Sequence, residues 1–84
     1  MTWGLVIASR AKRQLRRVPA GDRNDIDNAL SQLRKDPFFG DVKFLRGLGS
    51  LRRRVGDWRI LYELDERRNL IVVTAVKRRG SATY

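Results

Sequence analysis

The chain has 84 residues, of which 19 are Lys or Arg and 9 are Asp or Glu, so its formal net charge is +10. A chain of this length is expected to form a single domain spanning residues 1–84. It contains no Cys, which excludes disulfides and thiolate metal sites, and no His, which removes the commonest acid–base group. We therefore expect no metal ion and no cofactor. The excess positive charge predicts an anionic partner: nucleic acid, an anionic membrane or an acidic protein.

Hydrophobic residues make up 42% of the chain, which is typical of a folded domain. No run approaches the ~20 apolar residues that cross a bilayer. The apolar run 5–8 is too short for the core of a signal peptide. We therefore expect a cytoplasmic protein with no membrane partner.

The first half of the chain predicts one strand and two helices. Residues 3–8 are rich in β-forming residues, and Ser9 is placed to cap a helix that ends at residues 19–21. A second helix is expected to begin at Asp22 or Asn24 and to end at Asp36, because the residue before a proline leaves helical geometry. The apolar positions recur at helical spacing in both helices: Ala11, Leu15 and Val18 in the first, and Ile26, Leu30 and Leu33 in the second.

The second half of the chain predicts strands. Residues 38–47 are interpreted as irregular, and the strands are expected at 51–55, 58–64 and 70–76. Gly56 and Asp57 predict a two-residue hairpin turn of type II′, with glycine at its first central position. The order β-α-α-β-β-β indicates an α+β fold in which an antiparallel sheet packs on a helical hairpin.

The hairpin turn fixes which side chains share a face of the sheet, because side chains alternate along a strand. Arg54 is then directly opposite Arg59, an arrangement that destabilises a strand pair unless an anion lies across it. The alternative is an ordinary solvated face on a very basic protein. Arg53 points toward the core side and is expected to extend its charged end outward. The core face is predicted to hold Leu51, Val55, Trp58, Ile60, Tyr62 and Leu64, and the other face Arg52, Arg54, Arg59 and Leu61.

A second group of basic residues, Lys77, Arg78 and Arg79, follows the last predicted strand. In an antiparallel sheet the end of this strand lies beside the beginning of the strand 58–64. We therefore expect Arg78 to come near Arg59.

Three segments of the chain resemble the RelE/ParE toxin superfamily. The resemblance is carried by L-R-G-L at 45–48, by R-R-R-V-G-D-W-R-I-L-Y-E-L at 52–64, and by V-K-R-R at 76–79 followed by Tyr84. It extends over nearly the whole chain, because the predicted order of elements also fits. It implies the toxin of a type II toxin–antitoxin module and, in the RelE branch, a ribosome-dependent endoribonuclease that cleaves mRNA. It also implies an acidic RelB-like antitoxin that forms a hetero-oligomer with the toxin.

The resemblance assigns roles to individual residues. Arg59 and Arg78 match arginines that bind and stabilise the scissile phosphate, and Tyr84 matches a tyrosine that assists proton transfer or stacks on a base. Arg52 and Arg54 match basic positions on the preceding strand, although the family often has lysine at the first. Lys77 and Arg79 complete the expected RNA-binding set.

The implied chemistry suits the composition of the chain. RNA can be cleaved by its own 2′-hydroxyl, which requires alignment and charge stabilisation but no protein nucleophile. Arginine cannot act as the general base because it stays protonated, which leaves Tyr84 and Lys77 as candidates. Two other functions remain open: a ParE-like inhibitor of DNA gyrase, and a catalytically inactive RNA-binding relative.

Overall fold

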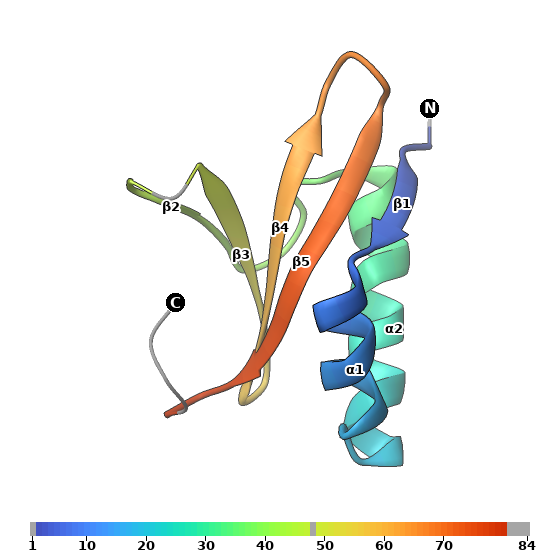
Figure 1. Ribbon diagram of the computed structural model, residues 1–84, viewed down its shortest axis with the longest axis vertical. Coiled ribbons are helices and arrows are strands. Elements are labelled where there is room, and N and C mark those ends of the chain that lie inside the picture. Colours follow the sequence, from blue (N-terminus) through green and yellow to red (C-terminus); the bar gives the residue numbers. More distant parts are fainter. Residues whose placement is uncertain (1, 48, 81–84) are drawn as a thin grey trace.

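The computed structural model describes residues 2–47 and 49–80, which form one five-stranded sheet and two helices. The strands lie in the order β1-β5-β4-β3-β2. Both helices pack on the same face of the sheet (Figure 1), which confirms the predicted α+β architecture. The elements are β1 (Gly4–Ile7), α1 (Ser9–Arg16), α2 (Ala20–Lys35), β2 (Val42–Leu45), β3 (Ser50–Val55), β4 (Trp58–Asp65) and β5 (Leu70–Arg78).

The sheet differs from the predicted one at its two edges. β1 runs parallel to β5, whereas the other neighbouring strands are antiparallel. β2 lies within the segment that was expected to be irregular. It is only four residues long and follows Gly40, so its sequence contains too little alternation to predict a strand.

Both helices begin earlier than predicted. The N-cap of α1 is Ala8, so Ser9 is the first helical residue and not the cap. The N-cap of α2 is Pro19, so α2 begins at Ala20, before Asp22 or Asn24. Proline lacks a backbone N–H, but the N-terminal turn of a helix has no internal acceptor for that group, so a proline is tolerated there. The predicted apolar stripes of both helices are buried.

The hairpin between β3 and β4 forms in the predicted register. Val55 pairs with Trp58 and Arg54 pairs with Arg59 across the turn. Gly56 has a φ of 58°, while the φ of Asp57 is not positive, as a type II′ turn requires. On the helix-facing side, Leu51, Ile60 and Tyr62 belong to the buried core, and Val55, Trp58 and Leu64 pack against it.

Tyr62 and Arg53 attach this hairpin to the helices. Tyr62 is fully buried, and its hydroxyl donates to the carbonyl of Pro37, just after α2. Burial raises the pKa of Tyr62 to about 12, although the nearby Arg53 guanidinium acts in the opposite direction. Arg53 extends outward as predicted and donates to Gln32 Oε1 at 2.9 Å and to the Phe39 carbonyl at 3.0 Å.

A β-bulge at Thr74 changes the faces of the sheet on which the side chains after it lie. Leu61 pairs with Ala75 and Tyr62 with Val73, so Thr74 is the extra residue. Its hydroxyl donates to the carbonyl of Leu61 at 3.3 Å. An extra residue reverses the alternation of all side chains that follow it. Lys77 therefore faces away from the helices.

Candidate functional site: a basic cluster on the open face of the sheet

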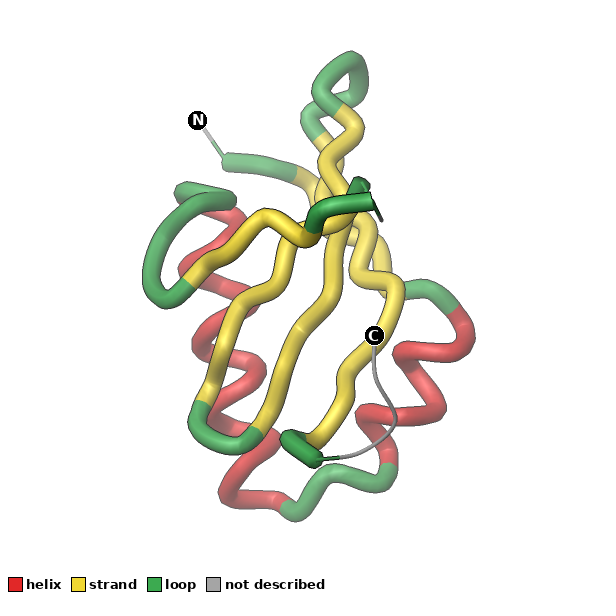
Figure 2. The backbone as a smooth tube through the Cα atoms, turned by 90° about the vertical axis from the view of Figure 1, so that its left-hand side faces the viewer, coloured by secondary structure: helices red, strands yellow, loops and turns green. Residues whose placement is uncertain are grey.

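Figure 2 shows the face of the sheet that the helices leave uncovered. A row of basic residues crosses three strands on this face. Arg54 on β3 pairs with Arg59 on β4, and Arg59 pairs with Lys77 on β5. Arg52 lies on the same face, two residues before Arg54. We call Arg52, Arg54, Arg59 and Lys77 the basic cluster. Leu61 and Ala75, which are next to it on this face, are buried.

Arg59 is the buried member of the basic cluster, with 7% of its surface exposed. Its Nη1 donates to two carbonyls of its own turn, Gly56 at 3.1 Å and Trp58 at 3.0 Å. No carboxylate of residues 2–47 and 49–80 forms an ion pair with it. A buried charge is costly unless an opposite charge compensates it. Arg59 is therefore the member of the cluster that gains most from a bound anion.

Asp41, just before β2, supplies the carboxylate of this region. Its oxygens lie 3.7 Å from Nη2 of Arg52 and 3.8 Å from Nη1 of Arg54. Asp41 is about half exposed, and ion pairs of this length in solvent contribute at most about 1 kcal/mol. The pairs orient Arg52 and Arg54 but leave the basic cluster with a net positive charge.

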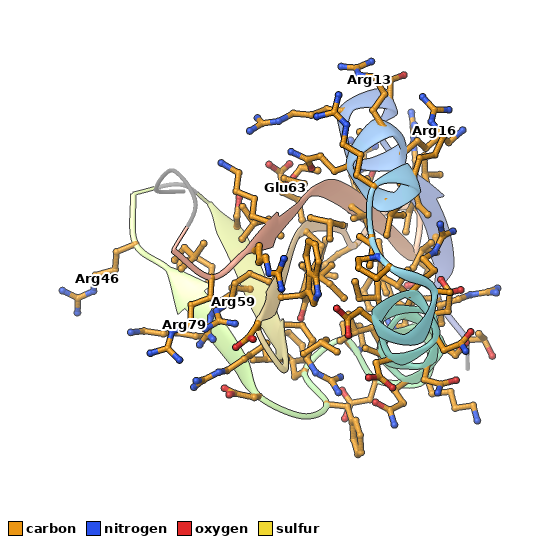
Figure 3. The ribbon with its side chains drawn as sticks, turned by 90° about the horizontal axis from the view of Figure 1, so that it is seen from below. Arg13, Arg16, Arg46, Arg59, Glu63 and Arg79 are labelled. Carbon is orange, nitrogen blue, oxygen red and sulfur yellow. The ribbon has the colours of Figure 1, made fainter. Side chains whose placement is uncertain are left out.

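Arg79 reaches the same end of the sheet through its backbone. Its N–H donates to the carbonyl of Asp57, in the turn that holds Arg59. Figure 3 shows Arg79 and Arg59 at this end, whereas Arg46 extends away from it and Glu63 lies apart. The structure thus brings the predicted RNA-binding residue Arg79 to the edge of the basic cluster.

Arg78 lies beside the beginning of β4 as expected, but its side chain is on the opposite face of the sheet from that of Arg59. Arg78 pairs with Trp58, and its Cζ lies 5.5 Å from the centroid of the Trp58 ring, on the helix-facing side. The bulge at Thr74 is the physical reason. With unbroken alternation after Val73, Arg78 would share the face of Arg59, but the extra residue puts Lys77 there instead.

Tyr84, the third predicted catalytic residue, lies outside the described residues. Within them, Lys77 is the candidate proton acceptor nearest in register to Arg59, since the two residues pair across β4 and β5. The other members of the basic cluster are arginines, which bind phosphate through several N–H donors but do not release a proton at neutral pH. This arrangement can bind and stabilise a phosphate group.

Two contributors to the site were missed by sequence reasoning. Asp41 was overlooked because β2 was interpreted as irregular, so nothing placed it beside β3. Thr74 was overlooked because a bulge in an apolar run leaves no mark in the pattern. No group of three or more acidic residues that could hold a metal ion occurs in the described part of the chain. No helix there is long and apolar enough to cross a membrane.

The sequence matches no family model and no curated protein. Its fold, in contrast, is similar to several solved structures. A chain of the archaeal RelE–RelB complex from Pyrococcus horikoshii OT3 is 26% identical, with 98% of this chain and 100% of that chain covered and a TM-score of 0.84. A chain of the intact RelBE toxin–antitoxin complex of E. coli is 17% identical, with 95% and 99% covered and a TM-score of 0.81.

The YoeB/ParE toxin from Agrobacterium tumefaciens is 19% identical, with 90% of this chain and 98% of that chain covered and a TM-score of 0.78. These likenesses extend over nearly the full length of both chains in each pair. They also agree with the element order and the mixed sheet described above. The chain therefore has the RelE-like toxin fold.

Proposed function

We propose that this protein is the toxin of a type II toxin–antitoxin module and that it cleaves mRNA on the ribosome. The observation that carries the proposal is the environment of Arg59: a buried guanidinium between Arg54 and Lys77, with no carboxylate partner in the described chain. A phosphodiester of RNA supplies the missing negative charge. The RelE-like fold of the chain supports the toxin role.

In the proposed reaction, the 2′-hydroxyl of the RNA attacks the adjacent phosphorus. The O2′–P bond forms and the P–O5′ bond breaks, which yields a 2′,3′-cyclic phosphate and a free 5′-hydroxyl. The general base takes the proton of the 2′-hydroxyl, and the departing 5′-oxygen gains one. Arg59 stabilises the charge that develops on the phosphate oxygens. Lys77 and Tyr84 are the candidates for the base.

The proposed partner is an acidic RelB-like antitoxin. The support is the charge of +10 on this chain and its similarity in fold to chains of RelE–RelB complexes. Covering the basic cluster with acidic side chains would block access of RNA. Co-expression with the product of a neighbouring gene for a small acidic protein should abolish toxicity and give a complex that co-purifies. Absence of any affinity between the two purified proteins would refute this assignment.

The cleavage proposal is tested by expressing the toxin and mapping the 5′ ends of cellular transcripts. We expect cuts in phase with codons that disappear in Arg59→Ala. Arg46→Ala is the matched control, because it removes the same charge from an exposed residue that extends away from the cluster (Figure 3), and it should leave the cuts in place. Intact transcripts together with a supercoiling defect would point instead to a ParE-like gyrase inhibitor.

A further inference from the structure

A second basic surface lies on the other side of β5. It is a groove of about 480 Å³ between α1 and the end of β5. Arg10, Gln14 and Arg17 line it from α1, Trp58 lines it from β4, and Lys77 and Arg78 line it from β5. No carboxylate is among the lining residues that the structure describes.

The groove exists because β1 is shorter than β5. β1 pairs with β5 only as far as the Ile7–Val73 pair. Beyond that point α1 runs beside β5, and Gln14 Oε1 accepts a hydrogen bond from the Val76 N–H at 2.7 Å. A helix side chain thus replaces a strand as the neighbour of β5, and because one side chain fills less space than a strand, a hollow remains.

The aromatic wall of the groove is held in place. The indole N–H of Trp58 donates to Asp22 Oδ2 at 3.0 Å, which ties the ring to the first turn of α2. The Arg78 guanidinium lies over the same ring. The groove therefore combines a fixed aromatic side chain with four cationic ones, a pairing that is typical of surfaces that bind single-stranded nucleic acid.

Lys77 joins this groove to the basic cluster. It pairs with Arg59 across the open face of the sheet, and it also lines the groove. The positive charge of the basic cluster therefore continues around the end of β5 into the groove, whose described lining residues include no carboxylate.

We propose that the groove between α1 and β5 is a second binding surface for RNA phosphates. It extends the path of an RNA strand from the basic cluster around the end of β5, and in this respect it rests on the proposed function. An acidic peptide would satisfy the same charges, but the continuity through Lys77 and the fixed Trp58 ring favour RNA. On this assignment Arg78 binds RNA, but it does so from the groove and not from the face of the sheet that holds Arg59.

The test measures the affinity of the purified chain for labelled 2′-O-methyl oligouridylates, which cannot be cleaved through the 2′-oxygen. A trinucleotide is short enough to occupy the basic cluster alone, whereas a dodecamer is long enough to reach the groove. The groove variant is the double substitution Arg10→Ala and Arg17→Ala. The control is Arg13→Ala and Arg16→Ala, which removes the same charge from exposed residues of α1 that do not line the groove and extend away from the Arg59 end (Figure 3).

We expect the groove variant to bind the dodecamer less tightly and to lower the slope of log K against log salt by about 1.4, since each phosphate contact with a single strand contributes about 0.7. Its affinity for the trinucleotide should stay within about twofold of the parent chain. Equal losses of dodecamer affinity in the groove variant and the control would overturn the proposal, because net charge would then explain both.

Two further arms separate this proposal from the proposed function. If transcripts remain uncut in the expression experiment but dodecamer binding still depends on Arg10 and Arg17, cleavage fails and the groove assignment survives. If cleavage depends on Arg59 but neither double variant changes dodecamer binding, the groove assignment fails alone. A polyglutamate dodecapeptide that binds more tightly than the dodecamer, in a manner dependent on Arg10 and Arg17, would overturn the assignment to RNA.

Discussion

Arg53 and Arg59 belong to the same hairpin, but they face opposite sides of the sheet and have different kinds of partner. The guanidinium of Arg53 donates to Gln32 on α2 and to the Phe39 carbonyl, and it lies 5.9 Å from the Phe39 ring centroid. Within residues 2–47 and 49–80, the guanidinium of Arg59 donates to carbonyls of its own turn, at Gly56 and Trp58. Arg53 therefore connects separate parts of the fold, whereas the Arg59 side chain forms its hydrogen bonds to the described residues within its own hairpin.

Arg53 is thus held by contacts across the fold, which is typical of a structural arginine. The backbone also makes room for Arg53: Gly40 has a φ of 86°, and a Cβ there would lie 2.6 Å from the Cζ of Arg53. Arg59 is the more buried of the two. Among the described residues, the Arg59 side chain is buried without linking its hairpin to another element, which supports the binding role that we propose for it.

The largest expected effect is the loss of cleavage activity when Arg59, but not Arg53, is replaced by lysine. Arg59→Lys keeps the charge but loses the fork of N–H donors that fits a phosphate. We expect its rate of mRNA cleavage on ribosomes to fall about 100-fold, as when one donor to a developing charge is removed. Arg53→Lys should cleave within about threefold of the parent rate, measured at equal folded fraction. Equal losses of cleavage rate in both variants would contradict the different roles of Arg53 and Arg59.

Tyr62 provides a pH-dependent readout of the helix-facing side alone. Its pKa rises from 10.0 to about 12 on burial. Between these pH values the unfolded chain has lost the phenol proton while the folded chain retains it. The stability contributed by the neutral phenol is therefore fully present below pH 10 and is lost as the pH rises to about 12, which amounts to about 2–3 kcal/mol.

The measurement for Tyr62 is urea unfolding of the parent chain and of Tyr62→Phe across this pH range. At neutral pH the variant should be about 1 kcal/mol less stable, because the Pro37 carbonyl loses its donor. Above pH 12 the order should reverse, because phenylalanine does not titrate. A difference in stability that stays constant from pH 7 to 12 would show that burial does not control the ionisation of Tyr62.

Arg53→Met should destabilise the fold by about 1–2 kcal/mol. It keeps the apolar stem of the side chain but removes the hydrogen bonds to Gln32 and Phe39. The stabilisation that added inorganic phosphate gives to the variant, measured as the shift in its unfolding midpoint, should equal that of the parent chain. A smaller phosphate shift would mean that Arg53 takes part in binding anions.

The same hairpin shows what sequence reasoning can and cannot predict. Residues 51–64 alternate strongly around a turn with a glycine, so the register and the opposition of Arg54 and Arg59 were predicted correctly. Residues 70–76 are apolar apart from Thr74, so they contain no alternation that could reveal a bulge. The fold class and the position of Arg59 opposite Arg54 therefore followed from the sequence, whereas the side on which Lys77 and Arg78 lie did not.

The smallest expected effect tests the opposition of Arg54 and Arg59 directly. Arg54→Gln removes one of two like charges that face each other across the strand pair, while Asp41 keeps Arg52 as an ion-pair partner. The substitution should therefore raise stability by about 0.2–0.5 kcal/mol at low salt. Salt screens the repulsion, so the gain should shrink as ionic strength rises. Arg67→Gln, which removes the same charge from an exposed turn, should show no comparable gain.

Added phosphate should reverse the order of stability of Arg54→Gln and the parent chain. Because the bound anion interacts favourably with both arginines, it stabilises the parent chain more than the variant. A gain that persists unchanged in phosphate would mean that no anion binds between Arg54 and Arg59. A reversal would show that the repulsion is retained in the free protein because the same two charges hold the ligand.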